Sequence, residues 1–343
     1  MSYGYQSFLN APNIQERIGS DQFIAGNPTM KPGHIGMIRF LNDPINTSAI
    51  RQQVQPGDGQ TRTVELTYTP RINPASVQAG AATTCTGGSV FGETSTQYSI
   101  NINTDHISLS ANIPLLVLST RSQGKDDYVA EIVMKLMRAI VQRANRDAIT
   151  AFNLLAGNFA NGVAGPLSVA TRAGNVFLPN PAEEIITQYE LAEGGNVPFV
   201  IGGGFINRWF RAMAASCCAS TNVLLEEYVN QNNMVHVYDP TFDQIIGANR
   251  FAVLEPGAMQ MLSFNLYEGA DVATANDDSF KAGILTDPLT GLRFDYQANR
   301  SCDQWTITLK LYRRFVTLPS DLFLTGDPLR GVNYLFPFTA TAS

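Results

Sequence analysis

Charged side chains are scarce in this chain. Lys, Arg, Asp and Glu make up 15% of the 343 residues, against about a quarter in an ordinary soluble protein. Apolar content is ordinary at 44%, so small and uncharged polar residues replace the missing charge. Such a composition suits surfaces that lie against other protein rather than water. The net charge of -6 argues against a general nucleic-acid binder, which needs excess Lys and Arg for phosphates, but leaves a local basic patch open.

Residues that bind metals or form disulfides are also few. The four cysteines, Cys85, Cys217, Cys218 and Cys302, have neither the CxxC spacing of a zinc site nor the density of a disulfide scaffold. We expect them to be reduced. The three histidines, His34, His106 and His236, are too far apart for a zincin motif or a sequence-local triad. The sequence therefore predicts no metal site, no cofactor and no catalytic residues.

Long apolar runs are absent as well. No segment approaches the roughly 18 apolar residues that cross a bilayer, and no basic-then-apolar leader opens the chain. We expect no membrane partner and no secretion signal.

The longest regular pattern in the sequence is a helix predicted over Asp126–Gly157. Its apolar side chains recur at a period of 3.6 residues without interruption. Acidic Asp126 and Asp127 open it, basic residues follow, and Gly157 can end it. At 1.5 Å per residue it would be about 48 Å long. This length favours a spine that joins several parts of a molecule, although a long helix across an ordinary sheet stays an alternative.

Two segments before the helix have few apolar residues to bury among themselves. Residues 1–60 contain frequent Pro and Gly with isolated apolar residues, which predicts an extended arm. Residues 61–112 alternate between apolar and polar, which predicts a long β-hairpin with its tip in residues 70–92. The alternating side chains are Val64, Leu66 and Tyr68 on one strand, and Tyr98, Ile100 and Ile102 on the other. Because an isolated hairpin is marginally stable, we expect these side chains to contact a neighbouring subunit.

The segment after the helix mixes strands and helices, which predicts an α+β or α/β domain. Gly202, Gly203 and Gly204 connect a predicted strand to a predicted helix, where a dinucleotide fingerprint would lie. Asn207 takes the place of the third Gly of that motif, so a tight turn is the alternative.

A second hairpin follows between about residues 292 and 311, with its predicted loop at Gln297–Gln304. Arg300 and Asp303 lie in this loop and could pair with the loops of other subunits around a rotation axis. Three arginines of the long helix, Arg138, Arg143 and Arg146, could meet phosphate groups, with a solvated helix face as the alternative.

The order of these parts resembles the major capsid protein of tailed double-stranded DNA phages, the Hong Kong 97 capsid fold, and "GANRFAVLEPGAMQMLSFNLYEG" is similar to its A-domain. The resemblance implies an α+β fold with six parts. These are an N-arm (1–60), an E-loop (61–112), a P-domain with the spine helix (113–157), an A-domain (158–290), a P-domain hairpin (291–315) whose P-loop is 297–304, and a C-terminal segment returning to the A-domain (316–343).

The resemblance further implies a structural role. The chain would assemble with itself as pentamers and hexamers in the host cytoplasm and form the virion capsid around double-stranded DNA. Expected partners are scaffolding, portal and decoration proteins, and DNA contacted non-specifically, with the three helix arginines facing the lumen. An encapsulin-like compartment of the same fold is an alternative. An α/β cofactor-binding enzyme that uses the Gly202–Gly204 turn is another.

Overall fold

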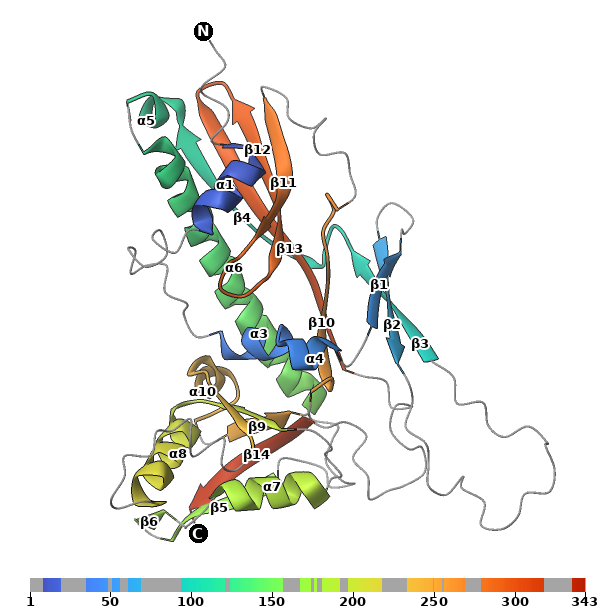
Figure 1. The fold of residues 1–343 in the computed structure, drawn as a ribbon, viewed down its shortest axis with the longest axis vertical. Coiled ribbons are helices and arrows are strands. Elements are labelled where there is room, and N and C mark those ends of the chain that lie inside the picture. Colours follow the sequence, from blue (N-terminus) through green and yellow to red (C-terminus); the bar gives the residue numbers. More distant parts are fainter. Residues whose placement is uncertain are drawn as a thin grey trace, which may run out of the picture.

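The computed structural model describes residues 9–19, 35–48, 51–55, 61–68, 94–120, 124–156, 167–173, 176–177, 181–191, 197–217, 233–248, 250–254, 256–268, 279–317 and 335–342. These residues form an α+β molecule in which three sheets are arranged around one long helix (Figure 1). The helix, α6 (Lys125–Ala156), has 32 residues. It agrees with the helix predicted over 126–157, because an uninterrupted apolar stripe fixes both its type and its length.

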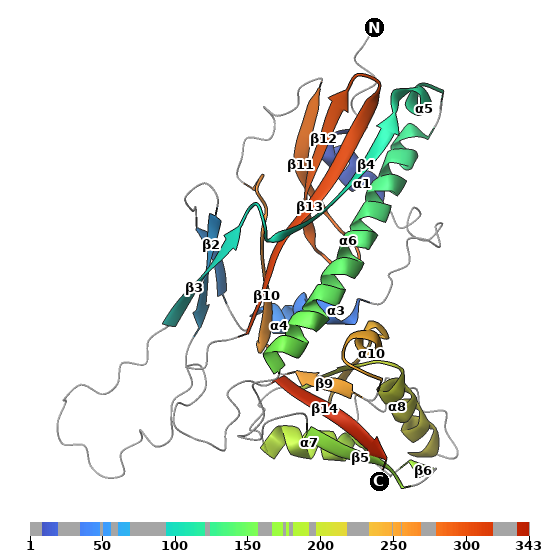
Figure 2. The same cartoon turned by 180° about the vertical axis from the view of Figure 1, so that it is seen from behind.

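The upper sheet has five strands and lies along the first part of α6 (Figures 1 and 2). Its members are β10 (Met259–Phe264), β11 (Phe280–Thr286), β12 (Arg293–Ser301), β13 (Gln304–Thr317) and β4 (His106–Pro114). All pairings are antiparallel, and the 14-residue β13 pairs with β12, β10 and β4. A short helix, α5 (Leu115–Thr120), follows β4.

The side sheet has three strands and stands to one side of the upper sheet (Figure 2). It contains β1 (Arg51–Gln55), β2 (Thr61–Tyr68) and β3 (Thr94–Asn101). β2 and β3 form the predicted hairpin, with Val64 opposite Tyr98. The predicted tip, residues 70–92, lies outside the described residues.

The lower sheet lies beyond the end of α6 and has six strands in the order β6-β5-β14-β9-β7-β8. They are β5 (Leu167–Ala173), β6 (Val176–Phe177), β7 (Phe199–Gly202), β8 (Val235–Tyr238), β9 (Arg250–Leu254) and β14 (Leu335–Ala342). Helices α7 (Pro181–Leu191), α8 (Gly204–Cys217) and α10 (Thr241–Ile245) accompany this sheet.

The N-terminal segment differs from the extended arm that we expected. Its described parts include three short helices: α1 (Ala11–Ile18), α3 (Gly36–Leu41) and α4 (Pro44–Ser48). β1 of this segment pairs with β2. Helices of five to eight residues are stabilised by tertiary packing rather than by intrinsic helix propensity. Their sequences therefore show no periodicity that would predict them.

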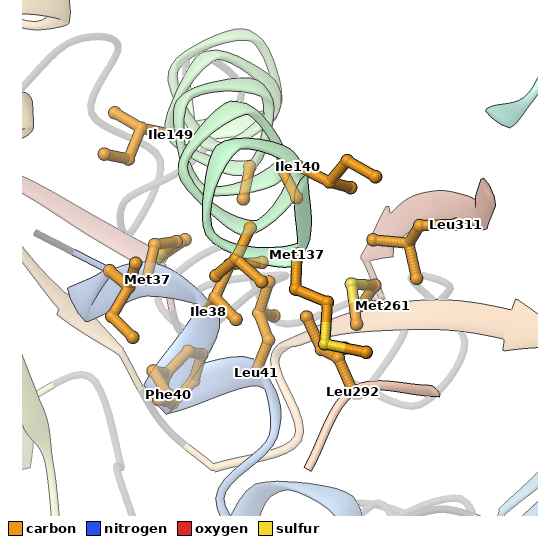
Figure 3. Packing of buried hydrophobic residues seen from close by; sticks show 14 of the residues in the cluster. Met37, Ile38, Phe40, Leu41, Met137, Ile140, Ile149, Met261, Leu292 and Leu311 are labelled. Carbon is orange, nitrogen blue, oxygen red and sulfur yellow. The ribbon is translucent and has the colours of Figure 1, made fainter. Parts of the chain in front are cut away.

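One apolar core runs from the upper sheet to the lower sheet along α6. In Figure 3, α3 packs below the helix, where Ile38 and Leu41 approach Met137. Met261 and Leu311 of the upper sheet complete this part of the core.

The strand pairing changes the expected boundary between two parts. Residues 158–290 were predicted to form one A-domain, yet β10 and β11 pair with β13 and β12 in the upper sheet. β9 and β10 are joined by a short turn but lie in different sheets, which the sequence pattern of two adjacent strands could not indicate.

Candidate assembly surfaces

The side sheet buries most of its predicted contact residues within its own chain. Val64, Leu66 and Ile100 are fully buried in a second apolar cluster, separate from the main core. Their partners come from β10 and β13: Leu262, Phe264, Tyr312 and Val316. Tyr98 and Ile102 are partly buried and pack on the same cluster. The side chain of Tyr68 lies outside what the structure describes.

This packing corrects the expected role of the buried residues. A side chain with no exposed surface cannot contact a neighbouring subunit, so Val64, Leu66 and Ile100 instead fix the side sheet to the upper sheet. Arg314 of β13 adds a polar tie, because its Nη1 donates to the carbonyl of Ser99 at 2.5 Å and its guanidinium lies 5.9 Å from the ring centroid of Tyr98. Any contact between this hairpin and another subunit must use other residues.

The turn between β12 and β13 is shorter than the predicted loop. Residues 297–301 belong to β12, and Ser301 pairs with Gln304, which leaves only Cys302 and Asp303 in the turn. The loop was predicted too long because polar Gln297 and Asn299 alternate with the buried Tyr296 and Ala298, which is the pattern of a strand with one covered face. We call this part of the molecule the tip: Arg300, Cys302 and Asp303.

The two charged residues of the tip remain accessible. Arg300 and Asp303 are both exposed. Their backbones are fixed, since the Arg300 N–H donates to Ser279 O and the Leu115 N–H donates to Asp303 O, both at 2.8 Å. The structure therefore leaves both side chains available for the predicted contact between copies.

The three helix arginines do not share one environment. Arg138 is buried and forms a bidentate ion pair with Asp287 in the turn between β11 and β12, with Nη2–Oδ1 at 2.8 Å and Nη1–Oδ2 at 3.2 Å. It cannot face a lumen. Arg143 and Arg146 are exposed, and Arg143 pairs with Asp147 one turn later at 3.1 Å.

The turn at Gly202–Gly204 is filled by the chain itself. A Cβ on Gly202 would come within 2.5 Å of Ile206 Cγ2, and a Cβ on Gly203 would overlap the carboxylate of Asp243. The Oδ2 of Asp243 accepts the Gly204 N–H at 2.7 Å. The first turn of α8 is thus already occupied by an internal carboxylate where a phosphate would bind, and the glycines are required by close packing.

A buried carboxyl group lies near the junction of the upper and side sheets. Asp295 of β12 accepts hydrogen bonds from the Leu266 N–H at 2.8 Å and from Asn265 Nδ2 at 3.2 Å. Burial raises the pKa of Asp295 above its ordinary value, and the hydrogen bonds to its carboxylate oppose that rise. Leu266 packs on the second apolar cluster, so Asp295 holds the chain segment that borders the side sheet.

Two other kinds of site are absent from the described residues. No group of three or more His, Cys, Asp or Glu in that part of the chain could hold a metal ion. No helix among the same residues is long and apolar enough to span a membrane.

Sequence reasoning missed two features, which lie in different parts of the molecule. Leu116 of α5 is 73% exposed beside the tip; the run Leu115–Leu118 was a signal that could have drawn attention to it. Gln15 of α1 binds the edge of β11, since its Nε2 donates to Thr286 O at 3.1 Å and its Oε1 accepts the Thr286 N–H at 2.7 Å. No local pattern could predict that pair, because 271 residues separate its members.

No protein-family model matches the sequence, and no curated protein matches it. Among solved structures, the chain is similar to that of the cyanophage A-1(L) capsid asymmetric unit, at 12% identity, with 84% of this chain and 90% of that chain covered and a TM-score of 0.47. For Mycobacterium phage Bobi the identity is 11%, 87% of this chain and 91% of that chain are covered, and the TM-score is 0.46. For the capsid of cyanophage P-SCSP1u the identity is 9%, 84% of this chain and 86% of that chain are covered, and the TM-score is 0.41.

Proposed function

We propose that the chain is a structural subunit of an icosahedral capsid shell that encloses a viral double-stranded DNA genome, with no enzymatic role. The observation that carries this proposal is the arrangement around α6. A 32-residue helix joins two sheets that lie at opposite ends of the molecule, while a third sheet stands to one side. Such a frame offers several separate surfaces to neighbours, and the scarcity of charge suits burial of those surfaces against protein.

In the terms of the resembled fold, α6 and the upper sheet form the P-domain and the lower sheet forms the A-domain. The side sheet corresponds to the E-loop, and residues 1–60 to the N-arm. We extend the P-domain to β10 and β11, because the hydrogen bonds of both strands go to the upper sheet. The tip then corresponds to the P-loop, where copies of the subunit converge.

The further partners follow from this role. Pentamers and hexamers of the chain would close the shell in the host cytoplasm, with scaffolding, portal and decoration proteins as additional partners. The exposed Arg143 and Arg146 would contact packaged DNA without sequence preference, because phosphate contacts carry no base information. Arg138 is removed from this set, since its charge is paired with Asp287.

Electron microscopy and size-exclusion chromatography of the purified chain test the proposal. We expect closed shells that elute as large particles. A clean monomer or dimer that binds a nucleotide would contradict the proposal and favour an enzyme. Native particles that hold nuclease-protected double-stranded DNA support a genome-enclosing shell, whereas particles that hold an enzyme and no DNA indicate an encapsulin-like compartment.

A deletion tests the role of the side hairpin in assembly. Removing residues 70–92 leaves β2 and β3 with their buried contacts, so we expect a folded, soluble subunit that fails to form complete shells. Normal particles from this variant would show that the hairpin tip is not needed between subunits.

A further inference from the structure

The short helix α5 has apolar side chains on more sides than its own chain covers. It begins with Leu115, Leu116, Val117 and Leu118. Leu118 is buried and Leu115 packs against the main core, but Leu116 is 73% exposed. A helix that is apolar all round is ordinarily covered all round.

Leu116 is held beside the tip by the backbone. Pro114 lies opposite Gln304 in the pairing of β4 with β13, and the Leu115 N–H donates to Asp303 O at 2.8 Å. Figure 1 shows α5 at the same end of the molecule as the β12–β13 turn. The exposed leucine and the exposed charges of the tip therefore lie at the same end of the molecule.

This surface has the composition of a protein interface. Exposed Leu116 lies at the same end of the molecule as exposed Arg300 and Asp303, and within the described part of the chain neither of these charges forms an ion pair. Interfaces commonly combine an apolar centre with a polar rim. Because the rim carries one charge of each sign, a rotated copy of the same surface can place its Asp303 near this Arg300. Because these two charges cancel, they give no net attraction for an anionic partner such as DNA.

We propose that α5 and the tip form one contact surface, that its occupant is the same surface of a second copy of this chain, and that Leu116 is its apolar centre. This inference rests on the proposed shell function and assigns α5 to the contact, in addition to the charged turn. The charges set the orientation of the copies, and the burial of Leu116 supplies most of the affinity, because burying a leucine contributes more than a rim ion pair.

Two leucines allow a matched test. Leu154 of α6 is 74% exposed, as Leu116 is, but lies near the other end of the long helix. Leu116→Ser and Leu154→Ser should both leave the thermal unfolding of the dissociated subunit within a few degrees of the parent. Leu116→Ser should raise the protein concentration at half-assembly by about tenfold or more, and Leu154→Ser should not.

The native Cys302 supplies a second readout, because it is exposed in the tip. In assembled parent particles, a short bismaleimide should link subunits into covalent oligomers. Cys302→Ser should abolish these links, and Leu116→Ser should reduce them at equal protein concentration.

Several outcomes would overturn the inference. Leu116→Ser particles that assemble as the parent does, or an equal loss in the Leu154→Ser variant, would remove Leu116 from the contact. A large loss of subunit stability in Leu116→Ser would mean that the chain covers this leucine itself. Particles without links through Cys302 would mean that the tips of neighbouring copies do not meet.

Failure of the inference can be told apart from failure of the proposed function. A parent chain that assembles while Leu116→Ser assembles equally well contradicts only the tip contact. A parent chain that forms Cys302-linked oligomers but no shells supports the tip contact and contradicts the shell. A parent chain with neither contradicts both.

Discussion

The β2–β3 hairpin and the β12–β13 hairpin both pack their apolar side chains against their own chain. They differ in the sheet and the apolar cluster that hold them. The β2–β3 hairpin belongs to a three-stranded sheet and is tied to the upper sheet through a small separate cluster. The β12–β13 hairpin lies inside a five-stranded sheet on the main core. Its turn can be exposed because the apolar side chains of both strands are packed in that core. An alternating pattern therefore identifies a strand's buried face, but not whether the partner is the same chain or another.

The largest expected effect is a loss of stability when the contact between the long helix and the β11–β12 turn is removed. This turn lies at the end of β12 away from the tip. Arg138→Ala would leave Asp287 buried without its cation, and we expect a loss of about 3–5 kcal/mol in the free energy of unfolding. Urea unfolding of the dissociated subunit measures this loss. Arg143→Ala is the control on the same helix, because its exposed pair with Asp147 should contribute less than about 1 kcal/mol. Equal losses in both variants would contradict a structural role for the Arg138–Asp287 pair.

The second-largest effect is expected for the apolar cluster that joins the side sheet to the upper sheet. Leu66→Ala should remove about 2–5 kcal/mol of stability, because Leu66 is fully buried and its loss leaves a cavity. Hydrogen exchange should accelerate first in β2 and β3, since they depend on the second cluster. The exposed Leu154→Ala should change stability little. Unchanged exchange in the two strands would mean that the second cluster does not hold the side sheet.

A third, smaller effect depends on pH and concerns Asp295. Burial raises the pKa of Asp295 in the folded state above the ordinary 3.8, so the folded chain binds a proton there more tightly than the unfolded chain. Lowering the pH through the folded pKa should therefore stabilise the parent, with the gain complete below about the ordinary value. Asp295→Asn cannot bind this proton, so the stability of the parent relative to the variant should increase as pH falls from 7 to 4. A constant difference across this range would contradict the raised pKa.

The smallest effect is expected for the charges of the tip. Arg300→Asp should weaken assembly at low ionic strength, by less than about 1 kcal/mol per contact, and leave the unfolding of the subunit unchanged. The double reversal, Arg300→Asp with Asp303→Arg, should restore part of the assembly, as light scattering can measure. Equal assembly of parent, single and double variants would exclude this charge pair between copies.

Regular patterns in the sequence predicted the extended elements of this fold. The long helix was predicted over 126–157 and observed at 125–156, and the hairpin predicted within residues 61–112 was observed as β2 (Thr61–Tyr68) and β3 (Thr94–Asn101). Both have a periodicity that runs the length of the element. The short helices α1, α3 and α4 were missed, because tertiary contacts stabilise them and Pro and Gly surround them.

The environment of single side chains was predicted less well. Arg138 lies on the polar side of the predicted helix, yet its partner Asp287 is 149 residues away in the sequence. Leu66 was expected to face another subunit, because the sequence does not show that side chains of β10 and β13 pack against it. Arg300 and Asp303 are both exposed, because Asp303 lies in the two-residue turn and Arg300 lies at the end of β12 next to it.

The amide group of Gln15 ends one hydrogen-bond ladder of the upper sheet. Its nitrogen and oxygen take up the carbonyl and N–H that Thr286 presents at the outer side of β11. An open sheet edge can add strands from copy after copy and so grow into a fibre. Particles of finite size need subunits that join at a few fixed places, and a single glutamine side chain closes one position where unlimited growth could begin.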